Sequence, residues 1–157
     1  MKIAVISDSH DNLFNLEKAV EIFNQKGIAH LIHLGDVCSP FAINLLNKLS
    51  CEYTGIFGNN DGEWLGINKI SGGRFHKGPI YREIFDKKII IMHEGDIADF
   101  ISEKVDFVLF GHSHNPGIKK VGKQFIVNPG TLSGYMAKSA TYAIIDTEKQ
   151  CTEIMDL

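Results

Sequence analysis

The chain has 157 residues, a length that fits one domain with a buried core. Hydrophobic residues make up 44% of it and charged residues 22%, which is ordinary for a globular protein. The formal net charge of -3 gives no broad basic surface, so we expect neither nucleic acid nor a membrane as a partner. We expect a single domain over residues 1–157 and leave the question of a homo-oligomer open.

The length of the apolar runs and the spacing of the cysteines bear on where in the cell the protein is located. The longest apolar runs, at residues 3–6 and 89–92, are far shorter than the roughly 20 residues of a membrane-spanning helix. The first residues lack the apolar core of a secretory signal. Cys38, Cys51 and Cys151 are widely separated, which is typical of free thiols in a reducing compartment. We therefore expect a cytoplasmic protein.

The first third of the chain alternates between strand and helix patterns. Residues 3–6 are continuously apolar, as in a strand covered on both faces. Asp11 or Asn12 is placed to cap a helix that Gly27 ends. The pattern continues with a strand at 30–34, a helix at 40–49 and a strand at 53–57. This succession is typical of parallel strands joined by helices.

The second half of the chain reads mainly as short strands. We expect only one helix there, near residues 97–102, and we expect residues 62–78 to form a mobile loop. Asp86-Lys87, Gly122-Lys123 and Glu148-Lys149 lie where hairpin turns are expected. The strands are expected at residues 80–85, 88–92, 106–110, 117–121, 124–127, 141–146 and 151–155. The fold class is thus mixed α/β, a four-layer α/β/β/α sandwich of two packed mixed sheets with helices outside.

Potential metal ligands follow five of the predicted strands. They are Asp8 and His10, Asp36, Asn59, His93, and His112 with His114. Because the carboxyl ends of parallel strands line one crevice of an α/β sheet, these side chains are expected to converge. Glycines precede three of them, at positions 35, 58 and 111, and let the backbone approach an ion closely. Carboxylate, amide and imidazole donors suit Mn, Fe, Ni, Zn or Co, and they suit Ca poorly.

Short motifs surround these candidate ligands and follow one another along the chain. They are Asp8-Ser9-His10, Gly35-Asp36, Gly58-Asn59-Asn60-Asp61, His93, Gly111-His112-Ser113-His114 and Asn128-Pro129-Gly130-Thr131. In order and spacing they resemble the motifs of the calcineurin-like metallophosphoesterases, from residue 3 to about residue 134. The short chain and its Gly58-Asn59-Asn60-Asp61 motif resemble the small prokaryotic phosphodiesterase branch, which is in turn similar to the metal-poor retromer subunit of eukaryotes.

The resemblance implies a two-metal site and a division of ligands. Asp8, His10, Asp36 and His114 would hold one ion, and Asp36, Asn59, His93 and His112 the other, with Asp36 bridging. A metal-activated hydroxide would then hydrolyse a small-molecule phosphate ester. We expect two divalent ions, with Mn²⁺ as the first choice and Ni²⁺, Fe²⁺, Co²⁺, Zn²⁺ or Mg²⁺ as alternatives.

The catalytic residues implied are Asn59, Asn60, Asp61 and His93. Phosphatase members of the family have a histidine where this chain has Asn60, and an amide cannot protonate a leaving group near neutral pH. We therefore expect a preference for diesters or activated esters. Asp61 is a candidate to orient a ligand.

Two other readings stay open beside the enzyme. The same fold is compatible with a weakly catalytic metal-binding or protein-interaction module, as the retromer resemblance implies. A nuclease is a third reading, although the sequence has no basic groove in its favour. Histidines outside the motifs, among them His33, and the thiol of Cys38 are expected to be structural.

Overall fold

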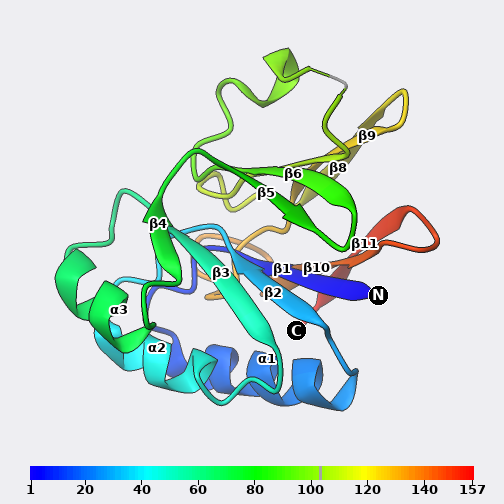
Figure 1. Ribbon diagram of the computed structural model, residues 1–157. Coiled ribbons are helices and arrows are strands. Elements are labelled where there is room, and N and C mark those ends of the chain that lie inside the picture. The colour runs from blue at the N-terminus through cyan, green and yellow to red at the C-terminus, as the bar shows by residue number, and fades with distance from the viewer. Residues whose placement is uncertain (103) are drawn as a thin grey trace.

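Two mixed sheets packed face to face form the centre of the protein. The structure is a computed structural model that describes residues 1–102 and 104–157. Both sheets and their packing are visible in Figure 1. In the six-stranded sheet the order is β11 (Cys151–Asp156), β10 (Thr141–Asp146), β1 (Lys2–Ile6), β2 (His30–His33), β3 (Glu52–Phe57) and β4 (Phe75–Lys77). In the five-stranded sheet it is β5 (Ile80–Ile84), β6 (Lys87–Ile91), β7 (Phe107–Leu109), β9 (Gln124–Asn128) and β8 (Gly117–Val121).

Pairing in the sheets follows the sequence pattern. β1, β2, β3 and β4 run parallel, as expected of strands joined by helices, and so do β6, β7 and β9. The predicted hairpins are confirmed, because β5 with β6, β8 with β9 and β10 with β11 are antiparallel neighbours. The carboxyl ends of β1, β2 and β3 therefore lie at the same edge of the first sheet.

Apolar side chains fill the space on both sides of the six-stranded sheet. Between the sheets, Ile3, Val5 and Ile32 pack against Ile89, Leu109 and other buried residues of the second sheet. On the other side lie the helices α1 (Leu13–Gln25), α2 (Pro40–Leu46) and α3 (Trp64–Ile70), which Figure 1 shows together on one face. The side chain of Asn12 accepts a hydrogen bond from the backbone N of Asn15, which confirms it as the cap of α1.

The predicted helix near residues 97–102 is wrong in type and length. The described part of this segment contains one 3-10 turn, η1 (Ala98–Phe100), in which only Ala98 is buried. Ala98 and Ile101 cover Val108 and Ile126 on the outer face of the second sheet. A segment with so few core contacts cannot offset the cost of nucleating an α-helix, so the outer layer over this sheet is thin.

Residues 62–78 are more regular than the sequence pattern predicts. They contain α3 and β4, which pairs in parallel with β3, so the expected loop is wrong over most of its length. Only Ile67 of α3 is buried, and an amphipathic pattern is therefore hard to detect. The second helix ends at Leu46 rather than near residue 49. No helix in the described residues is long and apolar enough to cross a membrane.

Candidate metal centre

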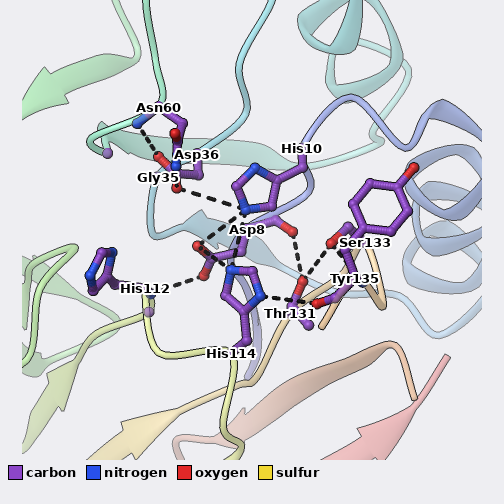
Figure 2. A network of polar contacts seen from close by, with 12 residues as sticks. Asp8, His10, Gly35, Asp36, Asn60, His112, His114, Thr131, Ser133 and Tyr135 are labelled. Atoms are coloured by element: carbon purple, nitrogen blue, oxygen red, sulfur yellow. Dashed lines mark hydrogen bonds and ion pairs between the residues drawn. The ribbon is translucent and has the colours of Figure 1, made fainter. Parts of the chain in front are cut away.

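Five loops bring the predicted ligands to one edge of the two sheets. Backbone hydrogen bonds join the loops, from Asp8 N to the Gly35 carbonyl and from His10 N to the Asp36 carbonyl, both at 3.0 Å. The two sheets are joined as well, since the backbone N of His112 donates to Asp8 Oδ2 at 3.0 Å. Figure 2 shows Asp8 at the centre, with His10, Asp36, His112 and His114 around it. The convergence expected from the strand ends is therefore present.

The first group of converging atoms comes from Asp8, His10 and His114. His10 Nε2 and His114 Nε2 are 3.2 Å apart, and Asp8 Oδ1 lies 3.3 Å from the latter. Two ligand atoms about 2.1 Å from a common ion, at roughly right angles, are separated by about 3 Å. The spacing of these atoms therefore fits one ion.

The second group comes from Asp36, Asn59, His93 and His112. The amide oxygen of Asn59 is 2.9 Å from both His93 Nε2 and His112 Nδ1. Asp36 Oδ2 lies 3.5 Å from His93 Nε2 and 3.8 Å from His10 Nε2. The carboxylate of Asp36 is thus placed between the two groups.

Backbone carbonyls fix which nitrogen of two imidazoles carries the proton. His114 Nδ1 donates to the carbonyl of Tyr135 at 3.0 Å, and His93 Nδ1 donates to the carbonyl of Leu34 at 2.8 Å. Each neutral ring consequently turns a bare Nε2 toward the acidic oxygens. Such carbonyl partners are usual behind histidines that bind metals. A sequence pattern does not reveal them, since any residue has a carbonyl.

The converging atoms are nearly all hydrogen-bond acceptors. The bare Nε2 of His93 faces oxygens of Asn59 and Asp36, and that of His114 faces Asp8 Oδ1. Asp8 Oδ1 is buried and has no hydrogen-bond partner among the described residues. Buried acceptors that face one another repel unless a cation or proton lies between them. The donor set therefore fits divalent metal ions, and the residues present match such a group.

The pKa values of Asp36 and His93 are shifted by the groups around them. Burial disfavours charge on Asp36, but hydrogen bonds from His93 and Asn60 hold the pKa of its carboxyl well below the usual range. Burial likewise opposes protonation of His93, yet its hydrogen bonds with Asp36 and the Leu34 carbonyl raise its pKa. Both shifts favour the charged form of the group, a carboxylate for Asp36 and an imidazolium for His93.

The backbone at the site is held in an unusual conformation. Asp8, His10, Asp36, His112 and His114 all have positive φ, between 43° and 63°. Positive φ is uncommon for residues other than glycine, and clusters of it are found at functional sites. Gly58 is required by close approach, because a Cβ there would overlap Asp36 Oδ1 and lie 2.6 Å from Asp36 N. The expectation that a glycine before the candidate ligand allows close approach of the backbone is confirmed at Gly58.

Asn60 and Asp61 contact Asp36 from different sides. The backbone N and the side-chain Nδ2 of Asn60 donate to the two oxygens of the Asp36 carboxylate, at 2.8 and 2.7 Å. The carboxylate of Asp61 accepts from the backbone N of Asp36, Cys38 and Gly58, at 3.0, 2.6 and 2.7 Å. Asp61 thus ties the loops after β2 and β3 together, and among the described residues its carboxylate makes no hydrogen bond to a side chain of the predicted ligands.

Two residues taken as structural lie close to the site. His33 is fully buried, accepts from the backbone N of Gly35 and contacts Ser9 Oγ at 3.0 Å, so it supports two of the site loops. Cys38 Sγ lies 3.6 Å from His10 Nδ1, and burial among acidic groups raises the pKa of the thiol to about 12.

Comparison with known families agrees with this geometry. The profile of the calcineurin-like phosphoesterase superfamily domain matches residues 1–150. The chain belongs to this superfamily. Among curated relatives, phosphodiesterase MJ0936 of Methanocaldococcus jannaschii is 35% identical over 161 residues, covering 96% of this chain and 95% of that protein. Phosphodiesterase YfcE of Escherichia coli K12 is 25% identical over 168 residues, covering 94% and 89% respectively.

Solved structures extend the comparison to the fold. The structure of an archaeal phosphodiesterase covers 100% of both chains with a TM-score of 0.92 and 34% sequence identity. Vps29 of Entamoeba histolytica with zinc has a TM-score of 0.73 over 99% of both chains, at 18% identity. The likeness to Vps29 shows a shared fold alone. The two mixed sheets are thus those of the metallophosphoesterase fold.

Proposed function

We propose that this chain is a divalent-metal-dependent phosphodiesterase. The observation that carries the proposal is the convergence of bare imidazole nitrogens on carboxylate and amide oxygens at one strand edge. Membership of the phosphoesterase superfamily and similarity to phosphodiesterase MJ0936 over nearly the full chain support the reaction class.

The ligand assignment is a proposal of its own. Asp36 would bridge, because its Oδ2 lies between His10 and His93. The remaining ligands would be Asp8, His10 and His114 on one ion and Asn59, His93 and His112 on the other. We propose Mn²⁺ as the cellular ion, since nitrogen and oxygen donors in this mixture suit it. We further propose that residues 1–157 act as one domain and, given three unpaired cysteines, that the protein works in the cytoplasm.

The chain's own side chains would position the reactants. When bound, two divalent ions would lower the pKa of a shared water and neutralise the charge that develops on the phosphoryl oxygens. Leu34 and Tyr135 hold His93 and His114 in the orientation that exposes Nε2. Asn60 Nδ2, which donates to Asp36, is also placed to donate to a substrate oxygen, but it cannot supply a proton to a leaving group. Esters with good leaving groups should therefore react faster.

Hydrolysis by metal-stripped protein tests the activity. Chelator-treated protein is assayed on bis-p-nitrophenyl phosphate and on p-nitrophenyl phosphate, with Mn²⁺, Ni²⁺, Mg²⁺ or Zn²⁺ added separately. We expect metal-dependent release of p-nitrophenol and a higher kcat/KM for the diester. Failure of every metal to support hydrolysis would favour the binding-module reading.

Metal content tests the bridging assignment. Asp36→Ala should lose both ions together with activity, since one carboxylate serves both groups. His76→Asn is the matched control, because it removes an imidazole from β4, outside the converging set. Retention of two tightly bound ions by folded Asp36→Ala, measured by elemental analysis after gel filtration, would refute the bridge.

A further inference from the structure

A mostly apolar cavity opens beside the second group of ligands. Its volume is about 470 Å³, and Asn59 and His93 form part of its wall. The rest of the wall comes from the end of β3, from α3, from the end of β4 with the loop that follows it, and from the loop after β6. Its apolar side chains are Phe57, Trp64, Pro79, Met92 and Ile97. A group bound to a phosphorus atom at the metal centre would extend directly into this space.

Trp64 is held in place within this wall. Its ring is stacked on Phe57, with centroids 4.5 Å apart and an interplanar angle of 8°. The indole nitrogen donates to the carbonyl of Asp61 at 2.6 Å. Despite these two restraints, 40% of the residue remains exposed. A fixed and exposed indole is a ready surface for stacking a planar group, because little side-chain entropy remains to be lost.

The charges around the cavity select against a second phosphate. Lys77 is the basic residue of the wall, whereas Glu94 and Asp96 are acidic, so their formal sum is -1. A neutral group is compatible with this balance, and a dianionic phosphate is repelled by it. The acidic side chains can also accept hydrogen bonds from the N–H groups of a heterocycle.

A second cavity lies on the other side of the ligands. It also measures about 470 Å³ and is lined by Asn60, His112, Tyr135 and Met136, among others. A phosphomonoester would leave one of the two cavities empty. A diester has a substituent for each.

We propose that the cavity at Trp64 binds a planar aromatic ester group, such as an aryl or nucleobase-bearing group, of a phosphodiester substrate. The inference rests on the proposed function and names its substrate class. Stacking on Trp64 provides affinity, and the acidic rim excludes substrates with a further phosphate in that position.

Intrinsic fluorescence tests the inference without catalysis. Trp64 is the chain's one tryptophan, so its emission reports on this cavity alone. With Mg²⁺ present, uridine monophosphate should quench the emission in a saturable manner, whereas ribose 5-phosphate should leave it unchanged. Absence of saturable quenching by the nucleotide, or equal quenching by both, would overturn the inference.

Kinetics on diesters that share a leaving group provides the second test. The substrates are methyl p-nitrophenyl phosphate, phenyl p-nitrophenyl phosphate and thymidine 5′-(p-nitrophenyl phosphate). With the p-nitrophenyl leaving group in the cavity at Tyr135 and the other ester group in the cavity at Trp64, Trp64→Leu should reduce kcat/KM for the phenyl and thymidine diesters about tenfold. The loss for the methyl diester should be less than about twofold, as expected for loss of one stacking contact. Trp64→Phe should restore part of the preference. Phe14→Leu, at an exposed aromatic on α1, is the matched control.

The outcomes separate this inference from the proposed function. No loss of kcat/KM for either aromatic diester in Trp64→Leu would refute the aromatic subsite and leave the phosphodiesterase intact. Failure of the wild type to hydrolyse any diester would instead refute the proposed function, and the fluorescence titration would still decide whether the cavity binds a planar group.

Discussion

Asp61 provides a direct test of how the site loops are held. Its carboxylate is 6% exposed and accepts hydrogen bonds from the backbone N of Asp36, Cys38 and Gly58. Asp61→Ala removes all three acceptor contacts at once. The loops after β2 and β3 then lose their common attachment.

The expected cost follows from those three bonds. A hydrogen bond to a charged group contributes about 1.5–3 kcal/mol, and a neutral one about 1 kcal/mol. Burial raises the pKa of Asp61 even though the amides of Gly58 and Cys38 lower it, so desolvation offsets much of the gain from charge. About 1 kcal/mol per bond is therefore appropriate, and Asp61→Ala should lower the free energy of unfolding by about 3 kcal/mol.

Urea unfolding of the chelator-treated protein measures this change, followed by circular dichroism. Glu21→Ala is the matched control, because it removes an exposed carboxylate from α1 and should alter stability by less than about 0.5 kcal/mol. Metal titration by calorimetry should also show weaker binding, since Asp36 loses a restraint on its backbone. A loss no greater than that of the control would show that the three amide contacts do not stabilise the loops.

Three further changes have defined outcomes. Burial lowers the pKa of His33 from 6.5 to about 3, so the neutral ring stabilises the fold above pH 6.5 and this stability is lost as pH falls toward 3. The free energy of unfolding in urea should therefore fall by about 2 kcal/mol between about pH 7 and pH 5. In His33→Gln, which has no titrating ring at this position, the fall over the same pH range should be smaller by that amount. Gly58→Ala places a Cβ against Asp36 and 2.8 Å from His93 Cε1, and should cost about 1–3 kcal/mol in thermal unfolding while weakening metal binding; unchanged values would contradict the close approach. Asn60→His should increase kcat/KM more for alkyl than for aryl diesters, and equal gains would argue against a missing acid.

The convergence of the site was predictable because strand ends are visible in the sequence. Apolar runs before Asp8, Asp36 and His93 indicate buried strands, and polar residues directly after such strands lie at one edge of a sheet. The family motifs added the grouping of ligands. Trp64 was missed, because α3 buries only Ile67 and its periodicity is too weak to distinguish a helix from a loop.

The sequence by itself determined the two mixed sheets, the hairpins and the set of side chains that gather at the strand ends, since these depend on local periodicity and turn residues. Tertiary structure alone decided the tautomers of His93 and His114, the amide partners of Asp61 and the stacking of Trp64 on Phe57. The physical reason is that backbone N–H and carbonyl groups and ring faces are common to many residues. Which of them meet is fixed only when distant segments pack.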